Sequence, residues 1–260
     1  MVQTPIRPLN LYPDSDGQPM ADNTLQYQWI VRLVENLRRL LADQTAFVAG
    51  DLLWYPVEVQ KGETPPSQAP DAMVVLGRPP GERGSYQQWQ EANIAPQVVF
   101  EIISPSNTVS EMAAKQTFYV EHGVLEMYFY DPDSYNFWGL VRETEAEDPR
   151  LVVAMNLPWT SPLLKIWFAL FEDGLEVFYP SGEPFKTLQE FAQERDAAQA
   201  ERDAAQAERD AAQTERDAAQ QREQRTQQQL DAAQQREQQM QQQLEAALAQ
   251  LQKLGIEPEK

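Results

Sequence analysis

Residues 98–130 read VVFEIISPSNTVSEMAAKQTFYVEHGVLEMYFY and predict a strand, a helix and a second strand. Residues 98–103 form an apolar run rich in β-branched and aromatic side chains, in which Glu101 is the only charge. The run therefore predicts a buried strand that carries one carboxylate, and a buried carboxylate requires a partner. The apolar cluster at residues 125–130 predicts the second strand.

The segment between the two strands predicts an amphipathic helix over residues 109–121. Ser106 or Asn107 is expected to cap its N-terminus, because both follow a strand-breaking proline and both can accept hydrogen bonds from helical N–H groups. The helix carries Lys115. Two parallel strands joined by a crossover helix are the smallest unit of a sheet covered by a helix, so we expect Lys115 to share a site with Glu101.

The composition is strongly acidic, with 21 Lys and Arg against 40 Asp and Glu and a net charge of -19. This balance argues against capture of nucleic acid by a broad basic surface, although a local groove or a divalent cation could supply positive charge. The absence of cysteine excludes disulfides and thiolate metal sites. With no apolar leader and no run of about 18 apolar residues, the sequence predicts a cytoplasmic protein without a membrane span.

The aromatic residues divide the chain, since every Trp and Tyr lies before residue 189. We therefore predict a globular α/β domain over residues 24–188, preceded by a flexible, proline-rich N-terminal arm at residues 1–23 without a chemical role. A heptad-repeat coiled coil is predicted over residues 189–254, followed by a tail at residues 255–260.

Several elements are expected before the central strand. Leucines at helical spacing predict a first helix over residues 24–42. Two short apolar runs within residues 47–59 predict a hairpin or paired strands. Residues 72–76 predict a buried strand that starts directly after Asp71, whereas residues 78–95 predict a long surface excursion.

Short strands are expected after the central unit. Residues 135–142 alternate between apolar and polar side chains and predict an antiparallel partner for the second central strand. Further strands are predicted over residues 151–157, 163–171 and 175–179. The Asp-Gly pair at residues 173–174 indicates a tight hairpin between the last two.

The C-terminal part repeats a seven-residue unit that starts QERDAAQ at Gln193, and this period is the signature of a left-handed coiled coil. Alanines form a weak seam in its first half, and leucines form a better one near its end, at Leu244, Leu248, Leu251 and Leu254. Gly255 and Pro258 are expected to end the helix. The pattern favours a homo-oligomer through residues 193–254 over the alternative of a solvated single helix.

Three residues could carry chemistry, namely Asp71, Glu101 and Lys115. Two carboxylates on neighbouring strands can hold Mg²⁺, which prefers oxygen ligands. A lysine beside the cation can orient a water molecule or stabilise charge on a phosphate. A buried structural ion pair between Glu101 and Lys115 would leave the same trace in the sequence.

The chain resembles the Uma family of restriction-endonuclease-like proteins, which belongs to the PD-(D/E)XK nuclease superfamily. The residues that carry this resemblance are Pro70-Asp71, Glu101 to Ser106, Glu111, Lys115, Tyr119, Gly123-Val124, Glu126 and Asp131-Pro132. The resemblance implies a restriction-endonuclease-like fold, a mixed sheet with the first helix on one side and the later helix on the other.

The resemblance also implies roles for individual residues. Asp71 and Glu101 would be the metal-binding acids for Mg²⁺ or Mn²⁺. The superfamily places its lysine two residues after the glutamate, where this chain has Ile103, and in the Uma-like pattern Lys115 takes that role from the helix. Asp51 and Glu111 resemble accessory acidic positions. Glu35 in the first helix is a further accessory candidate, although a solvated charge is the simpler reading.

The sequence thus predicts a magnesium-dependent endonuclease that hydrolyses DNA phosphodiester bonds. One alternative is a catalytically silent nuclease fold that assembles partners through its coiled coil. Another alternative is a protein that binds nucleic acid without cutting it, which would show steeply salt-dependent binding.

Overall fold

The computed structural model describes residues 11–17 and 19–253. It divides into two compact units, Met1–Phe191 and Ala192–Lys260, and each is considered by itself. Among the described residues no helix is long and apolar enough to cross a lipid bilayer.

A six-stranded mixed sheet forms the centre of the first unit, with strand order β1-β3-β5-β6-β7-β8. Only β5 and β6 run parallel, and every other neighbouring pair is antiparallel. The strands are β1 (Ala46–Ala49), β3 (Ala72–Leu76), β5 (Val98–Ile102), β6 (Glu126–Asp131), β7 (Asn136–Val141) and β8 (Arg150–Val153). The predicted mixed sheet is confirmed.

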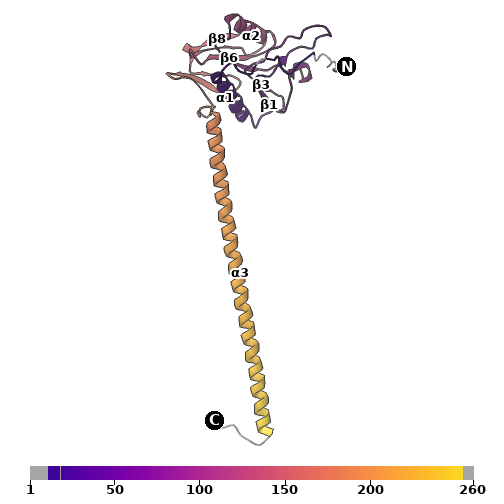
Figure 1. Cartoon of the computed structure of the whole chain (residues 1–260), viewed down its shortest axis with the longest axis vertical. Helices are drawn as coiled ribbons and strands as arrows, with labels where there is room; N and C mark the ends of the chain where they lie inside the picture. Colours follow the sequence, from indigo (N-terminus) through magenta and orange to yellow (C-terminus); the bar gives the residue numbers. More distant parts are fainter. Residues whose placement is uncertain (1–10, 18, 254–260) are drawn as a thin grey trace, which may run out of the picture. The chain divides into compact units, whose positions relative to one another are not determined.

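Helices α1 (Thr24–Leu40) and α2 (Val109–Glu121) cover opposite faces of this sheet (Figure 1). Side chains alternate along a strand, so Ala72 and Val74 of β3 join the core under α1, whereas Met73 and Val75 join the core under α2. The expected placement of one helix on each side is therefore confirmed.

The cap of α2 differs from the prediction. Thr108, rather than Ser106 or Asn107, is the N-cap, and its hydroxyl accepts a hydrogen bond from the N–H of Glu111 at 3.2 Å. The Glu111 carboxylate accepts from the N–H of Thr108 at 2.8 Å, which completes a capping box. Asn107 instead accepts from the backbone N–H of Ser104, so its side chain closes the turn before the helix.

The predicted hairpin within residues 47–59 is wrong. The second strand there, β2 (Trp54–Tyr55), does not pair with β1, but runs parallel to β4 (Tyr86–Gln87). Part of the predicted surface excursion is therefore buried, since Tyr86 is inaccessible to solvent. The physical reason is the burial of large aromatic rings, which drew Trp54 and Tyr86 together although they are distant in sequence.

A three-stranded sheet of order β11-β10-β9 follows, built from β9 (Trp159–Thr160), β10 (Trp167–Phe171) and β11 (Gly174–Phe178). The tight turn predicted at residues 173–174 is confirmed, because Phe171 lies opposite Gly174 in the register. The strands predicted over residues 151–157 and 163–171 were too long, whereas the one predicted over residues 175–179 agrees with β11 to within one residue. Strand β8 ends at Val153, and a short 3-10 helix over Ala154–Asn156 follows it. Another 3-10 helix lies earlier in the chain, over Gln88–Gln90.

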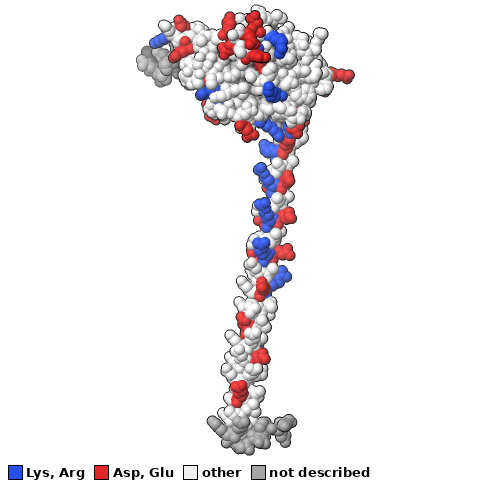
Figure 2. Space-filling model, turned by 180° about the vertical axis from the view of Figure 1, so that it is seen from behind, with Lys and Arg blue, Asp and Glu red and all other residues white. Residues whose placement is uncertain are grey.

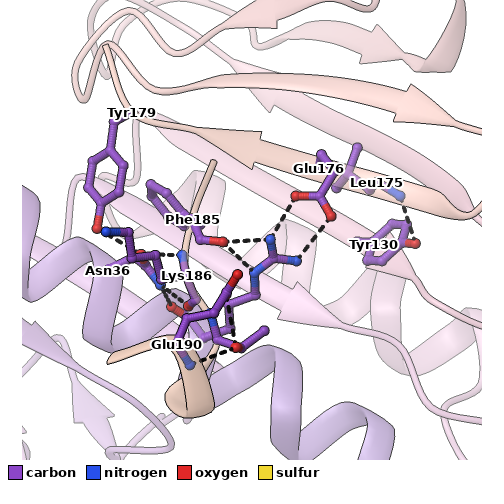
Figure 3. A network of polar contacts seen from close by, with 10 residues as sticks. Asn36, Tyr130, Leu175, Glu176, Tyr179, Phe185, Lys186 and Glu190 are labelled. Carbon is purple, nitrogen blue, oxygen red and sulfur yellow. Dashed lines mark hydrogen bonds and ion pairs between the residues drawn. The ribbon is translucent and has the colours of Figure 1, made fainter. Parts of the chain in front are cut away.

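The segment before the C-terminal helix is tied to α1 by a polar network around Asn36 (Figure 3). The Asn36 amide donates to the carbonyls of Arg32 and Lys186, both at 2.7 Å. Its oxygen accepts from the Tyr179 hydroxyl at 2.7 Å and from the Lys186 N–H at 2.8 Å. Because all four hydrogen-bonding positions of this buried amide are used, the network fixes where the chain leaves the domain.

Helix α3 (Leu188–Lys253) has 66 residues, and its side chains from residue 193 to residue 250 are exposed. Its first half carries many charges of both signs, and its later half carries fewer, as Figure 2 shows. The expected helix end at Gly255 and Pro258, with the last seam residue Leu254, lies outside the described residues.

Candidate active site

Strand alternation brings the two predicted acids together on the face that α2 covers. Ala72 pairs with Phe100, so Asp71 lies opposite Glu101 in the antiparallel register. Neighbouring residues Met73 and Val99 belong to the core under α2. Asp71 and Glu101 follow the same alternation and therefore point toward α2.

Helix α2 supplies two groups that hold Glu101. The Lys115 ammonium lies 2.7 Å from Glu101 Oε2, and the Tyr119 hydroxyl donates to Glu101 Oε1. Lys115 and Tyr119 are four residues apart, so they share one face of the helix. Glu101 is only 2% exposed, and both of its oxygens are paired.

Asp71 is held by the strand that carries Glu101. Its Oδ2 accepts from the backbone N–H of Ile102 at 2.6 Å, and its other oxygen makes no hydrogen bond to a described residue. Asp71 is 8% exposed. Burial, and then the charge of Glu101, raises the pKa of Asp71 well above its ordinary value, against the opposing effects of Lys115 and of the Ile102 N–H.

Lys115 remains a cation in this surrounding. Burial on its own lowers the pKa of Lys115, but attraction to Glu101, Asp71 and Asp51 outweighs that effect, and the net shift is upward. The ammonium is therefore present at neutral pH. It can donate hydrogen bonds and stabilise negative charge, but it cannot accept a proton.

Asp71 and Lys115 line a cavity of about 400 Å³, whereas Glu101, which is almost wholly covered, is not among its lining residues. Its charged lining consists of Asp16, Asp22, Asp51, Asp71, Glu111 and Lys115. Five carboxylates against one ammonium would repel a phosphate unless a cation neutralises them. A larger cavity of about 610 Å³ runs along β1 and contains none of the predicted site residues, so the chemistry points to the smaller one.

Two of the three accessory candidates lie at the cavity, and one does not. Asp51 and Glu111 line the cavity. Burial, followed by the charge of Asp16, raises the pKa of Asp51. Glu35 does not join them, because it is exposed on α1 and pairs with Arg38 at 2.9 Å.

Two residues that line the cavity, Asp22 and Gln26, were not predicted from the sequence, because both precede the strands and the helix that carry the predicted site residues. The Asp22 carboxylate accepts hydrogen bonds from the hydroxyls of Ser104, at 2.6 Å, and Ser106. Gln26 in the first turn of α1 is buried and lines the same cavity. The only signal was their place beside Asn23, the N-cap of α1.

The described part of the predicted flexible arm is in contact with the domain. The Val59 N–H donates to the Tyr12 hydroxyl at 2.8 Å, and the Tyr55 hydroxyl donates to the Pro13 carbonyl at 2.9 Å. Residues 19–22, which follow these contacts in the chain, form one wall of the cavity, and Asp22 among them accepts from Ser104. Asp22, from the arm that was expected to have no chemical role, therefore lines the cavity beside the predicted site residues.

The donor set fits a hard divalent cation. No group of three or more His, Asp or Glu side chains suited to a metal occurs in the part of the chain that the structure describes. Mg²⁺ commonly uses only one or two carboxylates and completes its octahedron with water and substrate phosphates. Asp71 offers an unbonded oxygen for such a site, whereas both oxygens of Glu101 are already paired with Lys115 and Tyr119 and would have to accept a cation in addition.

A family model and a solved structure match this chain. The family model described as "Uma2: Putative restriction endonuclease" matches residues 16–170. A solved structure described as a "putative nuclease belonging to DUF820" from Anabaena variabilis ATCC 29413 has 18% sequence identity and a TM-score of 0.41. That match covers 57% of this chain and 77% of the other. The comparison with curated proteins gives no match.

Proposed function

Because the chain belongs to the Uma2 family, described as a "putative restriction endonuclease", we propose that it is a metal-dependent endonuclease that hydrolyses DNA phosphodiester bonds. The observation that carries the proposal is the convergence of Asp71, Glu101 and Lys115 beside one acidic cavity. The cation is proposed from the chemistry of these side chains, and DNA as the substrate is proposed from the description of the family.

Asp71 and Glu101 are the residues that would hold Mg²⁺ or Mn²⁺. A cation bound there would supply Lewis-acid chemistry, activating water and neutralising charge on the phosphate. Asp71 offers its unbonded oxygen. Tyr119 and Lys115 of α2 fix the orientation of Glu101, which preorganises the carboxylate before any ligand arrives.

Lys115 has a second task in this proposal. The side chain of Lys115 is 22% exposed and lines the cavity, whereas the side chain of its partner Glu101 is only 2% exposed. It can therefore donate to a phosphate oxygen while it remains beside Glu101. Fixed donors aimed at developing negative charge are commonly the largest single contribution to such reactions.

The test is a titration of Mg²⁺ and Mn²⁺ into the full chain by calorimetry, run beside cleavage assays on single-stranded and duplex DNA. We expect binding and cleavage in the wild type, and loss of both in Glu101→Gln. The control is Gln28→Ala, an exposed position on α1 remote from the cavity lining. A wild type that neither binds metal nor cuts would favour the alternative, a silent fold in which Glu101 and Lys115 are a structural pair.

A protein that binds nucleic acid without cutting it makes a different prediction. Its affinity would fall steeply with salt as Lys and Arg release counterions from the phosphates. In the proposed nuclease the net charge of -19 makes binding depend on the divalent cation instead. Measuring DNA binding against salt, with and without Mg²⁺, separates the two.

We also propose that α3 assembles copies of the chain. A helix that is polar all round and exposed along its length is not expected to be stable alone without many pairs of side chains. Most of the large apolar residues of α3 are exposed, among them Leu230, Met240, Leu244 and Leu248. Measuring the mass of the full chain in solution by light scattering tests the proposal, and a monomer at every concentration would refute it.

A further inference from the structure

Gln26 links three segments of the chain at the cavity. Its side-chain Nε2 donates to the carbonyl of Ile102 at 2.9 Å, across 76 sequence positions. Its Oε1 accepts from the backbone N–H of Asp22 at 2.8 Å. A carbonyl can only accept and an N–H can only donate, so these two partners fix the orientation of the amide.

The partner of Gln26 is also the partner of Asp71. The pairing of β3 with β5 ends where Ala72 meets Phe100, and Ile102 lies beyond that end. The backbone N–H and C=O of Ile102 would otherwise lack the hydrogen-bonding partners that β3 supplies to the earlier residues of β5. Side chains replace the missing strand, with Asp71 accepting from the Ile102 N–H and Gln26 donating to the Ile102 carbonyl.

Burial makes this arrangement sensitive to the loss of one partner. Gln26 is 6% exposed and Ile102 is 3% exposed, so water cannot easily replace a missing hydrogen bond. A buried carbonyl that loses its donor either stays unpaired or turns toward another donor. If the carbonyl turns, the Ile102–Ile103 peptide plane rotates, and this rotation strains the adjoining Glu101–Ile102 peptide, whose N–H orients Asp71.

We propose that Gln26 is a positioning residue that sets the place of the Asp71 carboxylate through the backbone of Ile102. This inference rests on the proposed function only where it concerns metal and cleavage. The contact with Asp22 extends the same device to the N-terminal wall of the cavity, since Asp22 also holds Ser104 beyond the end of β5. Gln26 itself touches no reacting group.

The test uses Gln26→Met in the full chain, because methionine keeps the length and shape of the side chain but cannot donate or accept as the amide does. Gln28→Ala is the matched control, since Gln28 lies on the same helix, is exposed and does not line the cavity. The two readouts are hydrogen exchange of peptides that span Ile102, measured without metal, and Mn²⁺ affinity measured by calorimetry.

We expect Gln26→Met to accelerate exchange at Ile102 and to weaken Mn²⁺ binding about tenfold to a hundredfold, as is typical when a group that orients a metal ligand is removed. A variant that only melts earlier, with exchange at Ile102 and Mn²⁺ affinity equal to those of Gln28→Ala, would overturn the inference. If the wild type itself neither binds Mn²⁺ nor cuts DNA, the proposed function fails. The exchange at Ile102 then decides the role of Gln26 by itself.

Discussion

Lys115 Nζ lies 2.7 Å from Glu101 Oε2, and this ion pair joins a strand in the sheet to the helix that covers it. The two partners are unequal, since the carboxylate is 2% exposed and the ammonium side chain 22% exposed. The carboxylate therefore depends on the pair, whereas the ammonium keeps access to the cavity. Such an arrangement suits catalysis and also suits a structural pair, and mutations can tell the two apart.

Lys115→Met is expected to destabilise the fold and abolish cleavage. Removing one partner of a buried pair costs about 3 to 5 kcal/mol, and the partial exposure of Lys115 puts this case at the lower end. The double variant Glu101→Gln, Lys115→Met should regain much of the lost stability, because no unpaired charge remains, and should stay inactive. Urea unfolding and DNA cleavage measured on both variants test this.

The matched control is Arg38→Met, which breaks the exposed pair with Glu35. Exposed pairs contribute about 0 to 1 kcal/mol, so this variant should unfold almost as the wild type does and should retain activity. Cleavage by the double variant at the wild-type rate would contradict the assignment of Glu101 and Lys115 to the site.

Asp71→Asn is expected to stabilise the protein at neutral pH while it removes activity. The folded-state pKa of Asp71 lies above its ordinary value of 3.8, so the folded protein binds this proton more tightly than the unfolded chain does. Stability is therefore lost as pH rises from about 3.8 through the folded pKa. Asparagine does not ionise, so the variant avoids the cost of a buried charge, and a gain of about 0.5 to 2 kcal/mol is common for a single stabilising substitution.

Unfolding measured at a series of pH values, from about pH 4, near the ordinary pKa of an aspartate, to about pH 8, checks this. The stability difference between Asp71→Asn and the wild type should grow with pH and should shrink toward the acid end. A variant less stable than the wild type at pH 8 would show that the charged form of Asp71 supports the fold.

Tyr119→Phe is expected to weaken metal binding without removing any candidate metal ligand. The change leaves Glu101 Oε1 without its donor in a buried place, at a cost of about 1 to 3 kcal/mol. Loss of such a supporting group lowers metal affinity about tenfold to a hundredfold. Calorimetry with Mn²⁺ measures the effect, and Tyr27→Phe, at a ring that is 46% exposed, is the control. Equal affinities in the two variants would refute the role of Tyr119.

The sequence predicted the centre of the fold well because local pattern determines it. The bounds of α2 and β3 follow directly from apolar periodicity and turn residues. The meeting of Asp71 with Glu101 follows from strand alternation once two neighbouring strands are recognised.

The parts that escaped prediction depend on contacts between distant segments. Pairing of β2 with β4 cannot be read from propensity, which identifies strands but not their partners. Gln26 carries no charge and lies 76 positions from Ile102, so no local spacing marks it. Asp22 was assigned to a flexible arm because the serines that donate to its carboxylate, Ser104 and Ser106, follow β5 and are distant from it in sequence.

Self-association of α3 is expected to be confined to its later half. In the first half the heptad places alanine in the seam, flanked by Glu208 and Asp210 and their repeats. Two identical helices would then oppose acid to acid in either orientation. Near Leu244 the neighbouring residues include Gln241, Gln243 and Gln250, with Glu245 as the one acid, so fewer like charges meet there.

The lack of native cysteine makes this testable with single substitutions. Leu244→Cys should form a disulfide-linked dimer under mild oxidation much faster than Ala204→Cys, because only the later seam brings two chains together. Raising the salt concentration should narrow the difference, since screening weakens the repulsion between the acidic flanks. Equal crosslinking rates at low salt would mean that the alanine seam pairs as well, and the charge argument would then be wrong.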